Sequence, residues 1–202
     1  GTLGVITEVS FKVLPIAETQ STLKIHFCDA SILTKAINTP YDVSGTFYDV
    51  GSRVSYIRVE GFDKSVKYRI KQLLGEFSDF EVDILEMEES KKFWQNVSNL
   101  DFLKNIKGDL WRVSVRPTDG VKIIQMLNPK VGFLDWCGGL VWLRVDEGFD
   151  VREKMQKVAG HAMCLLGKFE QFHPISTAEK TLSNSIRKKF DPKMLLNREL
   201  LN

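Results

Sequence analysis

The chain has 202 residues, and its 28 Lys and Arg against 26 Asp and Glu leave a formal net charge of +2. Its 43% hydrophobic and 27% charged residues exclude a disordered or fibrous chain and predict one domain, or two small ones that share a core. So small a charge predicts no nucleic-acid partner, because modules that bind polyanions carry a clear basic excess. We also expect no transmembrane segment, since no stretch approaches the roughly 18 unbroken apolar residues that a membrane span needs.

The cysteines and the first residue give two further expectations. Cys28, Cys137 and Cys164 are odd in number and share no close spacing. This pattern argues against a disulfide framework and a structural zinc site, and it is typical of a reducing cytoplasm. The chain begins with Gly1 instead of Met, so we expect it to be part of a longer protein.

The first half of the chain predicts the order β-α-β-β-α-β. A strand over residues 9–14 precedes this unit and ends at Pro15. Asp63 is predicted to cap the second helix, whose apolar residues recur at helical spacing from Val66 to Leu74. The predicted strands of the unit cover residues 21–27, 45–50, 54–60 and 80–85, and its first helix covers residues 31–37.

The second half repeats this order after a helical link over residues 90–104. A hairpin is expected across Gly138 and Gly139, and Asp150 is expected to cap a helix. That helix has the apolar spacing of its counterpart at Val151, Met155, Val158 and Ala159. The predicted strands cover residues 109–116, 131–137, 140–145 and 161–166, with a helix at residues 120–127.

The two halves also match in their letters. Ile57-Arg58-Val59-Glu60-Gly61-Phe62-Asp63 corresponds to Leu143-Arg144-Val145-Asp146-Glu147-Gly148-Phe149-Asp150. Because strand, turn, cap and apolar stripe agree in order, we interpret the chain as a duplicated β-α-β-β-α-β unit. The predicted fold class is therefore α+β, with duplicated ferredoxin-like units that form one wide antiparallel sheet with helices on one face.

The last part of the chain predicts a helix. Ser176 and Glu179 have the spacing of a capping box, and the helix that they begin is expected to end at Asp191-Pro192. Residues 187–189, a basic run within it, are expected to form a solvated helix face.

Segments at both ends resemble motifs of the vanillyl-alcohol-oxidase type of FAD-linked oxidases. Residues 1–9, Gly-Thr-Leu-Gly-Val-Ile-Thr-Glu-Val, resemble the motif that closes the FAD-binding domain. Residues 190–197, Phe-Asp-Pro-Lys-Met-Leu-Leu-Asn, resemble the C-terminal motif that returns to the flavin, although Arg198 and Glu199 stand where the family has Pro and Gly.

Internal segments resemble, more narrowly, the C-terminal half of the FAD-binding E subunits of bacterial glycolate oxidases. These segments are Leu110-Trp111-Arg112-Val113-Ser114-Val115, Asp135-Trp136-Cys137-Gly138-Gly139, Trp142-Leu143 and Gly160-His161-Ala162. The resemblance implies that the chain is the cap domain of such a subunit, together with the adjoining ends of its FAD-binding domain.

The resemblance implies a division of the chain and a set of cofactor-binding residues. Residues 1–15 would end the FAD-binding domain, residues 16–170 would form the cap with halves 21–86 and 109–166, and residues 171–202 would return to the FAD-binding domain. The implied FAD-binding residues are Gly1, Thr2, Gly4, Val5, Ile6, Thr7 and Asn197. We expect FAD in the full-length protein and not in this fragment, which we expect to be inactive alone.

The implied function is flavin-based oxidation of glycolate or other 2-hydroxyacids within a complex. Electrons would pass from a catalytic flavoprotein subunit to an iron–sulfur subunit, in the cytoplasm or at the inner membrane through the complex. Related catalytic subunits carry a His-x-Gly-Asp-x-Asn-x-His metal segment on the cap hairpin. Here Trp136 and Trp142 stand where its ligands would be, and an indole offers no lone pair to a metal, so we expect no metal site.

Arg112 and His161 are the candidate catalytic residues, and each has a structural alternative. Arg112 would hold an anionic ligand or a flavin phosphate, or pair with a carboxylate. His161 would act as an acid or base, or be a structural histidine held by hydrogen bonds. Trp111, Trp136 and Trp142 would lie near the flavin or pack in the core.

Other segments and readings stay open at this point. Cys137 and Cys164 are expected to be buried thiols, and residues 90–104 would either dock a partner subunit or strap the two halves together.

Two other functions compete with the complex subunit. One is a self-sufficient, metal-free FAD-dependent 2-hydroxyacid dehydrogenase that uses Arg112 and His161, and the other is a non-catalytic ferredoxin-like ligand-binding or assembly module.

Overall fold

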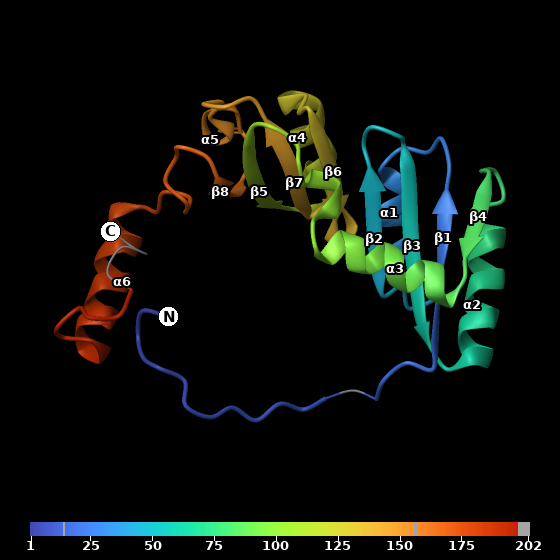
Figure 1. Cartoon of the computed structure of the whole chain (residues 1–202), viewed down its shortest axis with the longest axis horizontal. Helices are drawn as coiled ribbons and strands as arrows, with labels where there is room; N and C mark the ends of the chain where they lie inside the picture. The colour runs from blue at the N-terminus through green and yellow to red at the C-terminus, as the bar shows by residue number, and fades with distance from the viewer. Residues whose placement is uncertain (14, 156, 198–202) are drawn as a thin grey trace. The chain divides into compact units, whose positions relative to one another are not determined.

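The structure, a computed structural model, describes residues 1–13, 15–155 and 157–197. The described residues divide into two compact units (Figure 1). One unit is Ile16–His173, and the other combines the described parts of Gly1–Pro15 and Pro174–Asn202. None of the helices in the described residues has both the length and the apolar character that crossing a bilayer requires.

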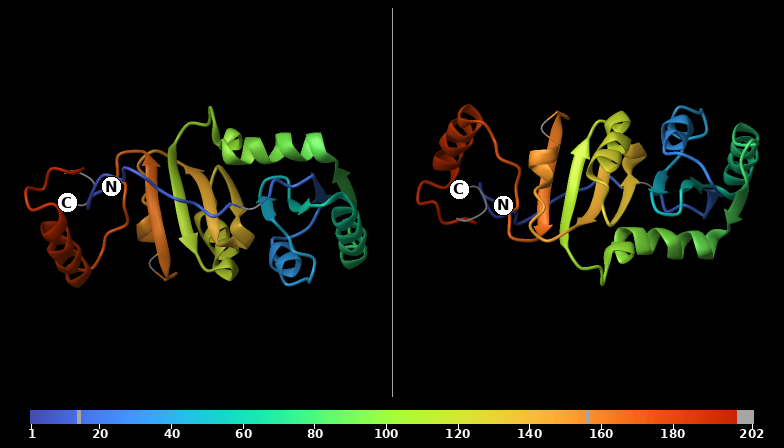
Figure 2. Two further views of the ribbon diagram at one scale, coloured as in Figure 1. Left: turned by 90° about the horizontal axis from the view of Figure 1, so that it is seen from below. Right: turned by 90° about the horizontal axis from the view of Figure 1, so that it is seen from above.

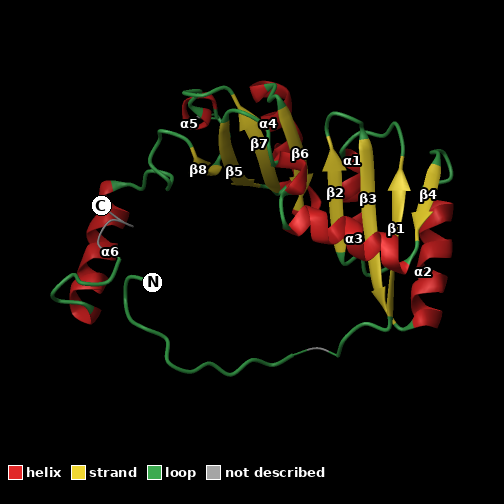
Figure 3. Cartoon of the chain, in the orientation of Figure 1, coloured by secondary structure: helices red, strands yellow, loops and turns green. Residues whose placement is uncertain are grey.

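The described residues of Ile16–His173 form one eight-stranded antiparallel sheet, shown in yellow in Figure 3. Its strands are β1 (Thr19–Ile25), β2 (Gly45–Asp49), β3 (Val54–Gly61), β4 (Val82–Leu85), β5 (Asp109–Val115), β6 (Val131–Asp135), β7 (Leu140–Val145) and β8 (Gly160–Leu166). The strand order is β4-β1-β3-β2-β6-β7-β5-β8, so the order of the second half mirrors that of the first. The predicted duplication and edge-to-edge joining are confirmed.

The two halves meet where β2 pairs with β6. Only three positions pair there, Phe47 with Asp135, Tyr48 with Leu134 and Asp49 with Phe133. The matching hairpin registers, Gly45 with Arg58 and Val131 with Arg144, make Phe47 equivalent to Phe133 and Tyr48 equivalent to Leu134. The seam therefore has two-fold pseudosymmetry centred on Tyr48 and Leu134.

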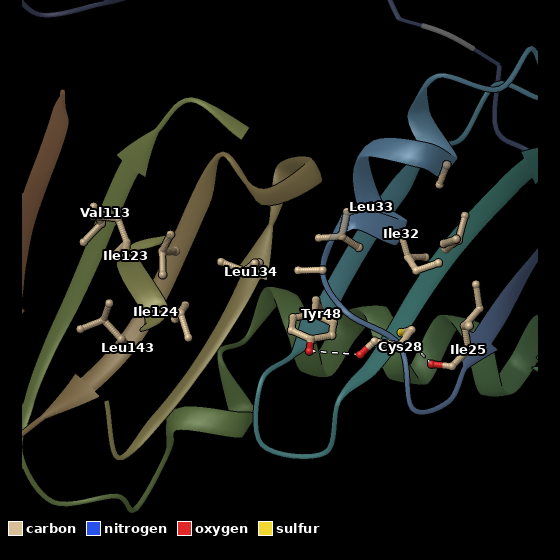
Figure 4. Close-up of a cluster of buried hydrophobic side chains, with 14 of the residues drawn as sticks. Ile25, Cys28, Ile32, Leu33, Tyr48, Val113, Ile123, Ile124, Leu134 and Leu143 are labelled. Carbon is tan, nitrogen blue, oxygen red and sulfur yellow. Dashed lines mark hydrogen bonds between the residues drawn. The ribbon is translucent and has the colours of Figure 1, made fainter. Parts of the chain in front are cut away.

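Helices of both halves cover one face of the sheet and bury the main core. They are α1 (Ser31–Ile37), α2 (Asp63–Glu76), α4 (Pro117–Leu127) and α5 (Val151–Lys154). Figure 4 shows Ile32 and Leu33 of α1 and Ile123 and Ile124 of α4 within this cluster, close to Tyr48 at the seam. Alternation in the strands supplies the sheet side of the core, because every second residue points to the same face.

Helix α3 (Met87–Ser98) lies on the opposite face of the sheet, as the two views of Figure 2 show. Trp94 donates to Thr22 of β1 at 2.9 Å, and Ser90 lies 2.7 Å from the same hydroxyl oxygen. Trp94 also packs with Phe47 and Phe133 across the seam in a second, aromatic cluster. The link over residues 90–104, continued by the short η1 (Asp101–Leu103), thus contributes to the packing of both halves.

Three local predictions were wrong. Phe62, not Asp63, is the N-cap of α2, and the Asp63 amide instead donates to the carboxylate of Glu18 at 3.1 Å. Trp136 and Cys137 belong to a short η2 turn (Trp136–Gly138) instead of β6. Helix α5 ends at Lys154, because Val158 bonds back to Met155 in a tighter turn and β8 begins at Gly160.

The smaller unit contains α6 (Thr177–Phe190). The predicted capping box is present, since the Glu179 amide donates to Ser176 Oγ and the Ser176 amide donates to Glu179 Oε2. The strand predicted over residues 9–14 is wrong for residues 9–13, since no described strand pairs with them, and Leu14 lies outside the described residues. Arg198 and Glu199 also lie outside the described residues.

Candidate functional site

A cavity of about 640 Å³ opens beside the seam, at the end where β2 begins and β6 ends. Its walls combine two arginines with three tryptophans, a carboxyl and a thiol. These residues are Arg58, Arg112, Trp94, Trp136, Trp142, Asp135 and Cys137. We call this cavity the seam pocket.

Strand alternation directs both arginines into the seam pocket. Arg58 lies between Ile57 and Val59, whose side chains are fully buried in the main core on the other face. Arg112 lies between Trp111 and Val113, which are buried in the same way. Successive side chains of a strand point to opposite faces, so the apolar neighbours fix the side on which each arginine lies.

The Arg58 guanidinium is held by neighbours within its own half. Its Nε donates to Ser44 Oγ and its Nη2 donates to the Ser44 carbonyl, both at 3.1 Å. A Glu60 carboxylate oxygen lies 3.6 Å away, and the Trp94 ring centroid lies 4.9 Å from Arg58 Cζ. Two of the five N–H donors of Arg58 are therefore already used within its own half.

The Arg112 guanidinium lies between two indoles. Its Cζ is 5.8 Å from the Trp136 ring centroid and 5.7 Å from that of Trp142, within the range of cation–π attraction. Arg112 makes no hydrogen bond and no ion pair within 4 Å to any described residue. Its donors are therefore available to a ligand that enters the seam pocket.

Asp135 supplies the carboxyl group of the pocket. Burial raises the pKa of Asp135, while the Trp136 amide and the charges of Arg58 and Arg112 lower it in part. The Trp136 amide donates to the Asp135 carboxylate at 2.7 Å. Burial favours the neutral form of this carboxyl, while both arginines remain charged. The net charge of the pocket is therefore positive, which favours an anionic ligand.

The η2 turn forms one wall of the pocket and has a strained backbone. Trp136 and Cys137 have φ values of 49° and 59°, in the left-handed region that side chains other than glycine rarely adopt. Hydrogen bonds hold them there, since the Cys137 amide donates to Thr46 Oγ1 at 2.8 Å. Gly138 has a φ of 95°, and a Cβ on it would lie 2.6 Å from the Pro117 carbonyl oxygen. This wall is therefore fixed against α4.

The two predicted catalytic candidates do not meet in one site. Arg112 lines the seam pocket, whereas His161 is exposed at the edge strand β8 and is absent from the pocket lining. The His161 ring lies 5.5 Å from that of His173, whose Nδ1 accepts from the Ala162 amide at 3.2 Å. Burial, then the charges of His161 and Arg152, lower the pKa of His173.

The sequence predicted only part of this pocket. Trp136 and Trp142 line it, but Trp111 is fully buried on the other face, with the guanidinium of Arg152 5.0 Å from its ring centroid. Cys137 is half-buried in the pocket wall, so its prediction as a buried thiol was wrong. Arg58, Trp94 and Asp135 were missed. Alternation in residues 54–60 could have found Arg58, but it could not have shown what faces it.

The predicted FAD-binding residues lie in the smaller unit. Asn197 Nδ2 donates to the Gly1 carbonyl at 2.6 Å, so the two ends of the predicted set are neighbours although 196 positions separate them. Gly4, Val5, Ile6 and Thr7 are exposed, and no described atom lies within 4 Å of the position that a Gly4 Cβ would take.

The tail beside Asn197 is held by a buried arginine. Arg187 is 2% exposed, and its Nη2 donates to the carbonyl oxygens of Leu196 and Asn197 at 2.6 and 3.3 Å. The prediction that the basic run is a solvated face was therefore wrong for Arg187, because this side chain closes the turn after α6. Among the described residues, no group of three or more His, Cys, Asp or Glu side chains is placed to hold a metal ion.

Fold and pocket together define an α+β protein made of duplicated ferredoxin-like units around a cationic, tryptophan-lined pocket. No protein-family model matches the chain. Over 198 residues the chain is 28% identical to the glycolate oxidase subunit GlcE of Escherichia coli strain K12, and this match covers 95% of the chain and 51% of that protein. The chain thus spans about half the length of the curated relative it matches, and the similarity expected from its motifs is confirmed.

Proposed function

We propose that the chain is the C-terminal part of an FAD-binding subunit of a glycolate-oxidase-like complex. The observation that carries this proposal is the 28% identity to a glycolate oxidase subunit over 95% of the chain. The duplicated ferredoxin-like sheet also fits the cap of α+β type that the resemblance implied for such a subunit. In this role the cap supports flavin-based oxidation of glycolate or related 2-hydroxyacids and the transfer of electrons within the complex.

The residues proposed to hold FAD are Gly1, Thr2, Gly4, Val5, Ile6, Thr7 and Asn197. Their setting suits a cofactor, because Gly4 has open space around it and Asn197 holds the Gly1 carbonyl beside that exposed segment. Glycine lets a backbone approach a cofactor closely, and Arg187 fixes the tail that carries Asn197. When bound, FAD would supply the redox chemistry, and the protein would orient it and set its potential.

The seam pocket would present a carboxylate-binding group to the anion that the complex handles. Arg112 offers a planar pair of donors that matches a carboxylate, and the adjacent indoles flank that contact. The partners proposed are a catalytic flavoprotein subunit and an iron–sulfur subunit. We place the complex in the cytoplasm, with peripheral association at the inner membrane.

The test is the absorbance spectrum of the full-length protein, first alone and then with its partner subunits. We expect flavin bands in both samples and bleaching by glycolate only in the complex. Absence of flavin from the full-length protein would overturn the proposal. Bleaching of the lone subunit by glycolate would instead support a self-sufficient dehydrogenase.

A further inference from the structure

We propose that the seam pocket binds a monocarboxylate with an aromatic or similarly bulky apolar group, a ligand considerably larger than glycolate. This inference rests on the proposed function for the part that the ligand plays in the complex, but the binding itself follows from the pocket alone. Three properties of the pocket carry it: its volume, its indole walls and the guanidinium of Arg112, which has no hydrogen-bond or ion-pair partner among the described residues.

The volume of the pocket is too large for a two-carbon acid. Glycolate has five non-hydrogen atoms, and even at the roughly 30 Å³ that a water molecule takes in the liquid it would fill only about 150 Å³. The pocket has about 640 Å³, within the range of roughly 300–1,000 Å³ that is typical of sites for larger organic ligands. A ligand that displaces most of the water must therefore carry an apolar part beyond its carboxylate.

The charges of the pocket provide for one carboxylate. Arg58 is occupied by Ser44 and Glu60, whereas Arg112 has no hydrogen-bond or ion-pair partner among the described residues. A second carboxylate on the ligand would have to turn to Arg58, whose guanidinium is already held by Ser44 and lies beside the Glu60 carboxylate. A monoanion therefore fits the pocket better than a dianion.

The walls of the pocket match an apolar ring. Trp136, 64% exposed, and Trp142 flank the Arg112 guanidinium, so a carboxylate on Arg112 places the rest of its ligand beside indole rings. Apolar side chains line the remaining wall: Ile37, Val43, Val97, Leu100 and Leu140. Aromatic groups pack against indoles in offset or edge-on geometries, which gives a ring more contact than an aliphatic acid of two carbons.

The test is calorimetric titration of the full-length protein with three probes that cannot be oxidised as 2-hydroxyacids. Phenylacetate carries both ring and charge, acetate lacks the ring, and phenylacetamide lacks the charge. We expect phenylacetate to bind at least about tenfold more tightly than either of the other two, since loss of a charged hydrogen bond or of a ring contact each costs about this much. Equal binding of acetate and phenylacetate, or no heat with phenylacetate at millimolar concentration, would overturn the inference.

Variants locate the binding. Arg112→Gln should lower the affinity for phenylacetate by about tenfold or more. Arg112→Lys keeps the charge but loses the planar pair of donors, so its affinity should lie between those of Arg112→Gln and the wild type. Trp142→Leu should weaken the binding of phenylacetate more than that of acetate, because it removes a ring contact that only phenylacetate makes. Lys71→Gln removes an exposed positive charge from α2, on the opposite face of the sheet, and should change nothing. Unchanged binding in a folded Arg112→Gln protein would place the ligand elsewhere and contradict the proposal.

This test and the test of the proposed function fail separately. Calorimetry with phenylacetate needs neither flavin turnover nor partner subunits. Binding of phenylacetate without glycolate-dependent bleaching would therefore support the proposed pocket ligand and contradict the proposed function in the complex. Bleaching by glycolate without phenylacetate binding would do the reverse.

Discussion

Asp135 illustrates how a single carboxyl links the stability of the fold to its pocket. Burial raises its pKa despite the nearby Arg58 and Arg112. The folded chain therefore keeps the Asp135 proton to a higher pH than the unfolded chain does. The stability that this carboxyl contributes is present at low pH and is lost as the pH rises through the folded-state pKa.

Asp135→Asn should therefore make the protein more stable than wild type at pH 7, with a difference that narrows towards pH 4. The asparagine stays neutral, and its carbonyl oxygen can still accept from the Trp136 amide. Urea unfolding at the two pH values measures the effect. Asp79→Asn, at an exposed position, is the control and should show little change at either pH. A variant less stable than wild type at pH 7 would show that the charged form is favoured.

For His173 we predict the opposite dependence of folding stability on pH. Its folded-state pKa lies below the ordinary 6.5, so below that pH the unfolded chain takes up a proton that the folded chain resists. Stability should thus fall as the pH drops from 6.5 through the folded-state pKa, and protonated Nδ1 could no longer accept from the Ala162 amide. His173→Gln should flatten this slope between pH 7 and 5. A ring-proton titration by NMR that gives a pKa of 6.5 or above would contradict the prediction.

At the scale of residues, the sequence could show which side chains face away from the core but not which of them meet. Arg112 was predicted because it interrupts an apolar strand. Its neighbours in the pocket come from β6, β7 and η2, and only the strand register brings them together. The prediction of Asp63 as a cap was wrong because it considered only neighbours in the sequence. The Asp63 amide donates a hydrogen bond to Glu18, which lies 45 positions away.

A glycine in the η2 turn tests the pocket wall, and a glycine in α2, away from the pocket, serves as its comparison. Gly138→Ala should destabilise the protein by about 2 kcal/mol or more, because its φ of 95° is unfavourable for alanine and the new Cβ would meet the Pro117 carbonyl oxygen. Gly75→Ala, in α2 with nothing within 4 Å of its Cβ, should stabilise the protein by roughly 0.5–1 kcal/mol. Urea unfolding of both variants checks the pair, and a neutral Gly138→Ala would show that η2 does not depend on its contact with α4.

Elements whose signals are local were predicted well. Helix α1 begins and ends at the predicted residues, and Asp150 and Ser176 both cap the helices expected of them. Errors arose where a partner decides the outcome. Residues 9–13 alternate like a strand but have no paired strand in the described chain, and α5 is cut short because β8 begins six residues after it.

At the scale of the whole sheet, the aromatic cluster on the α3 face should contribute strongly to stability across the seam. Only three residue pairs join β2 to β6, while Phe47 packs 4.8 Å from Phe133 and 5.2 Å from Phe102, ring centroid to centroid. Phe47→Ala should cost about 3–5 kcal/mol of unfolding free energy. Tyr68→Ala, 59% exposed on α2, should change it by less than about 0.5 kcal/mol. Denaturant unfolding measures both, and a loss near that of Tyr68→Ala would show that the backbone pairing suffices.

The two-fold arrangement of the halves has a consequence for how the pocket can evolve. Register makes Lys24 the counterpart of Arg112, Tyr56 that of Trp142 and Arg144 that of Arg58. Lys24 pairs with Asp83, and Arg144 is buried against the carbonyls of Leu103 and Gly108, so each counterpart serves its own half. In a dimer of identical units such positions would have to mutate together. Because both halves of the sheet belong to one chain, a residue that sets the ligand preference can mutate in one half while the equivalent residue of the other half continues to stabilise the fold.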